Sequence, residues 1–235
     1  MTLREALVQP DREQCLKAME KDLNDHLYRG HWKLVPLKHV PSHQKCLHMV
    51  WAMTRKRNPI DEIIKWKARL CAGGHMSREL VDYWDTYSPV VSWQTIRLIF
   101  VITLMNNWHI QSIDLAMAYP QADIQTDIYM KPPTVLSGFP IPDLPNLYTR
   151  FTKVFKSIKN LCELKDSGCT WNLHLRQGLL KRGWKHSTMY ECVYVKQGLL
   201  LISYVYGACL ISPSKSKIQQ KISSLKQDYD LIDDG

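Results

Sequence analysis

The order of helix-like and strand-like segments constrains the fold of this chain more than any other feature. Helices are predicted where apolar residues recur every three or four positions, and hairpins where two short apolar runs flank a polar turn. The predicted helices cover residues 12–27, 93–106, 170–182 and 215–229, and the predicted strand pairs cover 48–55 with 63–71 and 191–196 with 199–205. Because these segments follow no regular strand–helix–strand repeat, we expect an α+β fold in which an antiparallel sheet packs on helices.

Local signals define the ends of several elements. Asp11 is the expected N-cap of the first helix and Ser92 that of the second. The pair Gln197-Gly198 is typical of a two-residue hairpin turn. In the second helix we expect a broad apolar side, formed by Ile96, Ile99, Phe100, Thr103 and Leu104. Two further strands and a proline-rich loop are expected over 108–115, 127–130 and 134–146.

Size and charge restrict the class of protein. With 235 residues, 45% of them hydrophobic, the chain can bury one sizeable core, and we expect one compact domain, with either one lobe or two. The formal net charge of +9 favours a polyanionic partner, because Lys and Arg gain affinity by releasing counterions from phosphates. The longest apolar runs, 96–105 and 199–211, are shorter than the roughly 20 residues that cross a bilayer, so we expect no membrane partner.

Cysteine usage and the N-terminus indicate the compartment. The seven cysteines are an odd number with no C-x-x-C pair, which predicts free thiols in a reducing environment. The first residues contain no apolar stretch that could serve as a signal peptide. We therefore expect an intracellular protein, cytoplasmic or nuclear.

Basic residues are concentrated in the first predicted hairpin. Strand alternation places Lys65, Lys67 and Arg69 on one face, with Trp66 between them. Two interpretations fit this pattern equally well, a strand face exposed to solvent and a face that contacts phosphates. A connector at 35–48 contains a set that could in principle bind zinc, namely His39, His43, Cys46 and His48. Their spacing matches no zinc-finger pattern, and the favoured interpretation is a polar surface loop.

Several motifs occur in an order that belongs to one family. Gly-rich phosphate loops and the H-E-x-x-H and G-x-S-x-G signatures are missing. The motifs present are Trp66–Leu70 with Gly73-Gly74, then Asp82–Val91, Gln111–Ala122 and Ile128–Pro133. This series resembles the fingers and palm of copia-type retrotransposon reverse transcriptases, the RNA-directed DNA polymerase region of the Pol polyprotein. The resemblance runs in order from about Glu5 to Gly235.

The resemblance implies a two-metal polymerase site, and this chain departs from it. Mg²⁺ would be held by three aspartates, because hard cations take carboxylate oxygens. Asp114 matches the first aspartate and is the one metal ligand that survives. Tyr119 matches the aromatic residue beside the nucleotide sugar. Tyr206 and Gly207 stand where the adjacent pair of the "YVDD" turn belongs. We therefore expect a reverse transcriptase by descent that has lost catalysis.

A second motif carries further changes. The family's "YGLKQ" segment and the Trp after it appear here as Cys162–Asp166 and Trp171, and Glu163 and Asp166 replace glycine and glutamine. The resemblance implies that Lys67 and Arg69 contact the nucleotide. It also implies that the template-primer of RNA or DNA contacts five residues, Lys65, Lys67, Arg69, Lys165 and Trp171.

The resemblance also implies a domain organisation. We expect one reverse transcriptase domain over 1–235, with an N-terminal helix and connector in 1–50, a fingers-like part in 51–107 and a mostly palm-like part in 108–235. Thumb, RNase H and integrase domains are expected to be absent or encoded elsewhere. Two other readings stay open: a non-catalytic nucleic-acid-binding module that uses the basic residues, and a translation product without function.

Overall fold

A computed structural model describes residues 3–133 and 152–233, and its contacts divide the chain into two units. Unit 1 contains residues 1–84 and 123–167, and unit 2 contains 85–122 and 168–235. The loop expected over 134–146 lies outside the described residues. The structure is a mixture of helices and sheets, as expected for an α+β protein.

Unit 1 combines helices with a five-stranded sheet. Its elements are α1 (Leu3–Leu7), α2 (Arg12–Tyr28), β1 (Trp32–Pro36), β2 (Leu47–Arg57), β3 (Ile63–Ala72), β5 (Tyr129–Lys131) and β6 (Lys153–Ser157). The strand order is β1-β6-β5-β2-β3. Strands β5 and β2 run parallel and the other neighbours antiparallel, so this sheet is mixed. The expectation of an antiparallel sheet is wrong for this pair, because β2 and β5 are far apart in sequence and no hairpin joins them.

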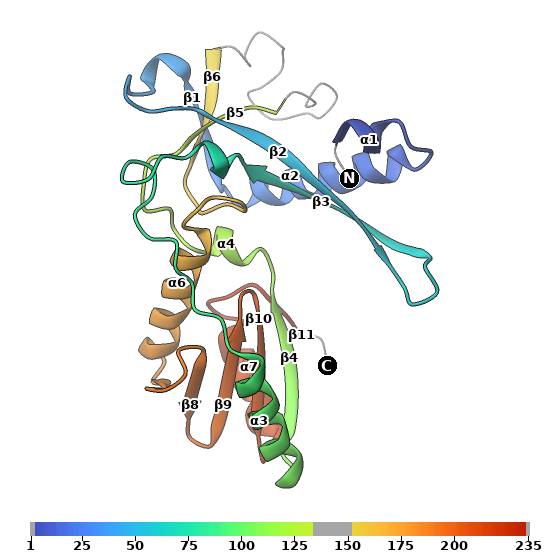
Figure 1. Ribbon diagram of the computed structural model, residues 1–235, viewed down its shortest axis with the longest axis vertical. Coiled ribbons are helices and arrows are strands. Elements are labelled where there is room, and N and C mark those ends of the chain that lie inside the picture. The colour runs from blue at the N-terminus through green and yellow to red at the C-terminus, as the bar shows by residue number, and fades with distance from the viewer. Residues whose placement is uncertain (1–2, 134–151, 234–235) are drawn as a thin grey trace. The chain divides into compact units, whose positions relative to one another are not determined.

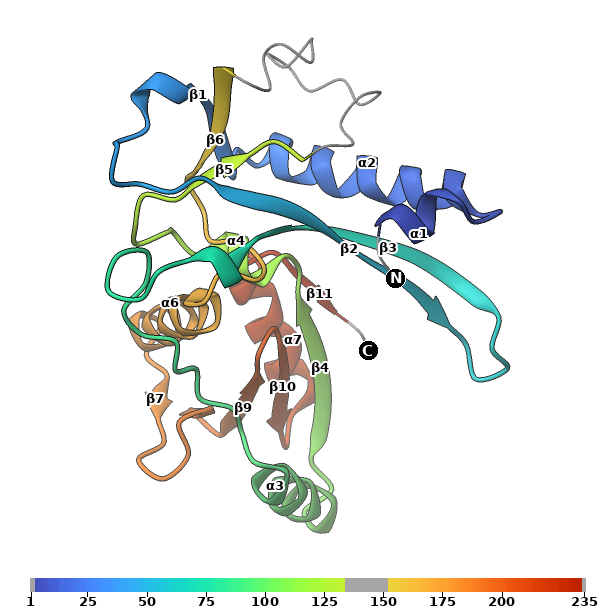
Figure 2. The same cartoon turned by 45° about the horizontal axis from the view of Figure 1, so that its top comes forward.

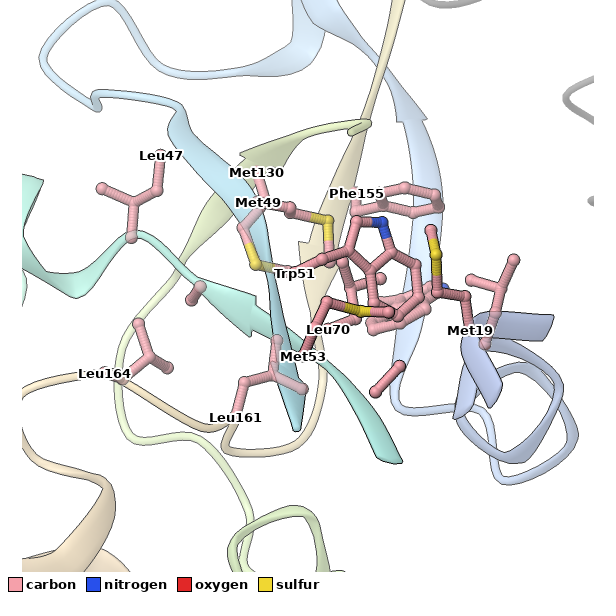
Figure 3. Packing of buried hydrophobic residues seen from close by; sticks show 14 of the residues in the cluster. Met19, Leu47, Met49, Trp51, Met53, Leu70, Met130, Phe155, Leu161 and Leu164 are labelled. Atoms are coloured by element: carbon pink, nitrogen blue, oxygen red, sulfur yellow. The ribbon is translucent and has the colours of Figure 1, made fainter. Parts of the chain in front are cut away.

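The core of unit 1 forms where α2 packs against the β2–β3 hairpin (Figure 2). Trp51 of β2, Met19 of α2 and Phe155 of β6 belong to one buried cluster and lie close together in Figure 3. Alternation along β2 and β3 puts Trp51 opposite Leu70 on the core face. The carboxylate of Asp22 on α2 accepts a hydrogen bond from the Leu70 amide at 2.7 Å, which satisfies a donor on the sheet's outer strand.

Asp11 has a different role from the one predicted. Its side chain makes no capping hydrogen bond to α2. It instead accepts hydrogen bonds from Arg55 at 2.6 Å and 2.8 Å and from the indole of Trp66 at 2.5 Å. The Arg55 bond is the main reason that the pKa of Asp11 falls to about 2. The N-cap prediction failed because two charge-assisted bonds across the unit compete with a local one.

Unit 2 contains a six-stranded sheet that is antiparallel throughout. Its elements are α3 (Trp93–Met105), β4 (His109–Leu115), α4 (Ala118–Gln121), α6 (Ser167–Lys181), β7 (Lys185–His186), β8 (Val193–Lys196), β9 (Leu199–Tyr204), β10 (Gly207–Ser212), α7 (Lys215–Leu225) and β11 (Leu231–Asp233). The strand order is β11-β4-β10-β9-β8-β7, and the middle strands lie side by side in Figure 1.

Helices pack on both faces of this sheet. One buried cluster joins Leu201 and Leu210 to Leu179 of α6 and Ile222 of α7. A second, smaller cluster joins Ile99 of α3 to Ile202 and Ile211 on the opposite face. Successive strand residues point to opposite faces, so each strand contributes to both clusters. The expected antiparallel sheet packed on helices is found in unit 2.

Turn and cap signals were read correctly in unit 2, and the outer side of α3 was not. Ser92 caps α3 by accepting a hydrogen bond from the Thr95 amide. Gln197 and Gly198 both have positive φ, as a two-residue type I′ hairpin requires. Of the predicted apolar side, Ile99 and Thr103 are buried and Ile96 packs against the core, whereas Leu104 is 74% exposed. Leu104 was misplaced because α3 is apolar around most of its circumference, so periodicity does not define the edge of the buried face.

Other expected boundaries shift by a few residues. The strand expected over 127–130 is β5, Tyr129–Lys131, and the last helix ends at Leu225, before residue 229. The 35–48 connector contains the end of β1 and a 3-10 helix, Leu37–His39, and His39 and His43 are exposed. No group of three metal-binding side chains occurs within the described ranges.

All seven cysteines are free, as predicted. No described helix is both long and apolar enough to cross a bilayer.

Two neutral histidines are buried where α2 leads into β1. Nδ1 of His26 lies 2.8 Å from Nδ1 of His31, and the His26 ring stacks on Trp32. Burial is the main cause that lowers the pKa of His26 to about 3 and that of His31 to about 4. Burial also raises the pKa of Asp22, 3.8 Å from His26, to about 6.

These pKa values predict acid sensitivity. Unfolded histidines bind protons near pH 6.5, whereas the folded ones stay neutral, so their contribution to stability is complete above that pH and is lost as the pH falls toward 4. Asp22 has the opposite effect on stability. Its pKa in the folded protein lies above the ordinary 3.8, so its contribution to stability grows as the pH falls. We expect the free energy of unfolding, measured in urea, to drop by roughly 2 kcal/mol from pH 7 to pH 5.

The Asp22→Asn variant is the matched control for this prediction. It removes the compensating carboxyl, so the drop should grow by about 1 kcal/mol. An equal or smaller drop in Asp22→Asn would contradict the assignment of opposite signs to these groups.

Candidate active site

Strand register in unit 2 places Asp114 beside the hairpin that was predicted to carry the chemistry. Tyr204 of β9 pairs with Gly207 of β10, and Gly207 pairs with Asp114 of β4. Directly opposite residues point to the same face of a sheet. Tyr204, Gly207 and Asp114 therefore form one row across three strands, on the face that also carries Ile202.

The turn above this row is held in a strained conformation. Val205 and Tyr206 connect β9 to β10, and Val205 has a φ of 53°. A β-branched residue rarely adopts positive φ, and such strain persists only where neighbouring groups impose it. The Tyr206 carbonyl accepts from the Leu115 amide at 2.7 Å, and the Val205 carbonyl accepts from the Trp171 indole at 2.7 Å.

The role of Trp171 changes accordingly. It was expected to contact nucleic acid, but its side chain is 2% exposed and belongs to the α6 side of the core. The N–H of its indole ring donates a hydrogen bond to the Val205 carbonyl in the turn. A side chain this deeply buried offers no surface to a ligand, so we correct its role to positioning the Val205 turn.

Asp114 lines a cavity of about 350 Å³ on its face of the sheet. It is the single carboxylate among the cavity's lining residues. Across residues 3–133 and 152–233 its side chain has no hydrogen-bond or ion-pair partner. Tyr204 and Tyr206 are both about half exposed at the same cavity.

This donor set does not fit a pair of Mg²⁺ ions. Two ions need several carboxylate oxygens to balance their charge. The cavity offers the Asp114 carboxylate, hydroxyl groups such as that of Tyr206, and only backbone at Gly207. Asp123 and Asp127, the next acids along the chain, lie in unit 1 and form ion pairs with Lys159 and Lys156.

Tyr119 lies shortly after Asp114 in the same unit. It belongs to the short helix α4, which follows the left-handed residue Met117. Its ring is partly buried against the core cluster of unit 2. The structure thus brings Asp114, Tyr206, Gly207 and Trp171 together at one hairpin and places Tyr119 on the element that follows β4.

The predicted basic residues lie in unit 1. Lys65, Lys67 and Arg69 occupy alternate positions of β3, on the face opposite the Trp51 core. Lys65 is exposed and pairs across the strands with the exposed Lys56. Like charges directly opposite one another destabilise a hairpin unless an anion lies near. Lys165 is also exposed in unit 1.

The altered segment Cys162–Asp166 keeps a backbone shape that suits glycine. Glu163, which replaces the family's glycine, has a φ of 69°. Its carbonyl oxygen would lie 1.8 Å from a Cβ added at Gly74, so Gly74 tolerates no side chain. Burial raises the pKa of Asp166 above its usual value. The backbone at position 163 therefore has a shape that favours glycine over the glutamate that is present.

Sequence reasoning missed the residues that complete the cavity. Phe100 of α3, Ser112 of β4 and Cys209 of β10 all line it. Alternation along the predicted strand would have placed Ser112 on the Asp114 face. The contribution of Phe100 depends on how α3 packs on the sheet, which has no local sequence signal.

The sequence is similar to known proteins over most of its length. A family model described as reverse transcriptase (RNA-dependent DNA polymerase) matches residues 30–235. The retrovirus-related Pol polyprotein from transposon RE1 of Arabidopsis thaliana is 28% identical over 94% of this chain. That from transposon TNT 1-94 of Nicotiana tabacum is 25% identical over 100%, and the transposon Ty1-H Gag-Pol polyprotein of Saccharomyces cerevisiae is 25% identical over 94%.

The chain spans only a small part of these relatives. It covers 15% of the Arabidopsis protein, 17% of the tobacco protein and 12% of the yeast protein.

The left-handed backbone at Glu163 generates a stability prediction. Glu163→Gly should raise the free energy of unfolding by about 1 kcal/mol, because glycine adopts positive φ without a steric penalty. Chemical denaturation of both proteins measures the difference. Glu163→Ala removes the carboxylate but keeps the Cβ, so it should give no such gain. Equal stabilisation by alanine would assign the effect to charge instead of backbone conformation.

Proposed function

The chain belongs to the reverse transcriptase (RNA-dependent DNA polymerase) family, with copia-type Pol polyproteins among its relatives, and we propose that it binds template-primer but no longer polymerises. The observation that carries the proposal is the Tyr204–Gly207–Asp114 row, in which one carboxylate remains. The retained fold explains binding, and the altered row explains the loss of chemistry.

Loss of catalysis follows from the charge that nucleotide addition requires. The reaction is an in-line phosphoryl displacement, in which two metal ions stabilise the attacking and leaving oxygens. Mg²⁺ is the family's metal. With Asp114 as the single lining carboxylate, the ions lose most of the negative charge that holds them. The change from Gln to Asp at position 166 and from Gly to Glu at 163 removes further family groups.

Nucleic-acid binding is supported by the basic face of unit 1. Lys56, Lys65, Lys67 and Arg69 stand on one side of the β2–β3 hairpin, which in this proposal is the fingers-like part. Lys56 and Lys65 stand directly opposite one another, and a polyanion would relieve the repulsion between them. Backbone phosphates carry no sequence information, so this face predicts binding without sequence preference.

Primer extension tests the loss of catalysis. On an RNA template with Mg²⁺, the unmodified chain should give no product. The double variant Tyr206→Asp with Gly207→Asp should regain extension, because a side chain at Gly207 meets only ordinary contacts, at 3.7 Å and beyond. Adding Asp114→Asn to the double variant should abolish the product again. Extension by the unmodified chain would contradict the proposal.

A companion variant separates the two altered segments. It carries Glu163→Gly and Asp166→Gln in addition to the restored aspartates. If only this variant extends, both segments contribute to the loss. If no variant extends while all bind template-primer, the turn is not a sufficient cause, and that part of the proposal is wrong.

Salt dependence tests nucleic-acid binding. Anisotropy of a labelled primer-template should show affinity that falls steeply with salt. Lys65→Gln and Arg69→Gln should each reduce the slope of log affinity against log salt by about 1. Lys226→Gln, an exposed lysine of unit 2, is the matched control and should leave the slope unchanged. Binding that does not respond to salt would overturn the phosphate-contact proposal.

A further inference from the structure

The row across the three strands has a gap in its middle. Tyr204 and Asp114 stand on either side of Gly207. Adjacent opposite residues have Cα atoms about 5 Å apart, so the two flanking side chains arise roughly 10 Å apart. Gly207 places no side chain between them. The cavity of about 350 Å³ includes this space.

The walls of the cavity are mostly apolar and carry one negative charge. Val91, Ile96 and Phe100 line it from α3 and the segment before it, and Ile202 lines it from β9. Asp114 has no partner of opposite charge among the described residues. An apolar cavity of this size with a few convergent polar groups has the character of a small-molecule site.

Two tyrosines complete the chemistry of the cavity. Tyr204 and Tyr206 are 47% and 46% exposed, so part of each ring remains open to a ligand. The face of an aromatic ring attracts cations, and aromatic residues next to a carboxylate are a recurrent way to bind ammonium groups. Phosphates and other anions are disfavoured, because Asp114 would repel them.

We propose that this cavity binds an organic cation, an ammonium group carried on an aromatic or aliphatic body. The ammonium lies over Gly207, between the Tyr204 ring and the Asp114 carboxylate. The body packs against Phe100, Ile96 and Ile202, where its burial is favourable. This site shares the Tyr204–Gly207–Asp114 row with the proposed function and rests on its loss of metal binding, but its test uses no nucleic acid, so the failure of one is distinguishable from the failure of the other.

The residues that replace the family's aspartates create the site. An aspartate at position 207 would fill the space over the middle of the row and would add a hydrated charge. Glycine opens that space, and Tyr206 adds a ring to the rim. The two changes therefore convert a predicted metal-binding position into one with a single charge and apolar walls.

Binding of two matched probes tests the proposal. The probes are 2-phenylethylammonium and its neutral analogue 2-phenylethanol, measured by calorimetry on the full chain without nucleic acid. We expect the cation to bind about tenfold more tightly, from its contacts with the rings and the carboxylate. Equal affinity for both probes, or no binding of either, would overturn the proposal.

Variants locate the site. Asp114→Asn should remove the preference for the cation and leave the affinity for 2-phenylethanol unchanged. Gly207→Leu should block both probes, and a Cβ at this position meets the Tyr204 and Ile113 carbonyl oxygens only at 3.7 and 3.9 Å. Tyr206→Leu should weaken cation binding several-fold, whereas Tyr190→Leu, a similarly exposed tyrosine outside the cavity, should not.

Thermal unfolding of each variant confirms that it is folded. If Gly207→Leu fails to fold, Asp114→Asn decides the question, because this substitution keeps the shape of the side chain. A cation preference that survives in Asp114→Asn contradicts the proposal.

Discussion

The register of β9, β10 and β4 determines what unit 2 can do. Hydrogen bonding between these antiparallel strands fixes Gly207 opposite both Tyr204 and Asp114. A shift of one residue would turn Asp114 toward the buried cluster of Leu210 and Leu179, where an unpaired carboxylate is costly. The same pairing supplies the Leu115 amide that holds the turn through the Tyr206 carbonyl. Cavity, turn and carboxylate thus all depend on one ladder of backbone bonds.

The sequence predicts those features whose causes are local. The Ser92 cap and the Gln197-Gly198 turn depend on residues next to one another, and both were found where expected. Asp11 was misread because its partners, Arg55 and Trp66, are more than forty positions away. Strands β1 and β6 were missed for the same reason, since they pair with each other across most of unit 1. Long-range partners decide these cases, and no local pattern contains them.

The candidate site was predicted as a set of positions more successfully than as a set of roles. The motif order identified the turn at Tyr206 and Gly207, and the structure places it beside Asp114. It gave Trp171 a surface role, although the indole is buried beneath the turn. The motif order did not predict the cavity. Val91 and Phe100 line it only because α3 and the segment before it pack on the sheet. Roles that depend on burial require the tertiary structure.

Contacts within each unit impose a strained backbone at two positions of this chain. Val205 and Glu163 both hold positive φ values that their side chains disfavour, at a cost of about 1 kcal/mol or more each. Neighbouring contacts impose these shapes: the Trp171 bond on one, and the close approach to Gly74 on the other. The pairing of β9, β10 and β4 is made by backbone hydrogen bonds, so it does not depend on the charge of the side chains in the Tyr204–Gly207–Asp114 row. The proposed loss of catalysis is therefore compatible with an intact sheet in unit 2.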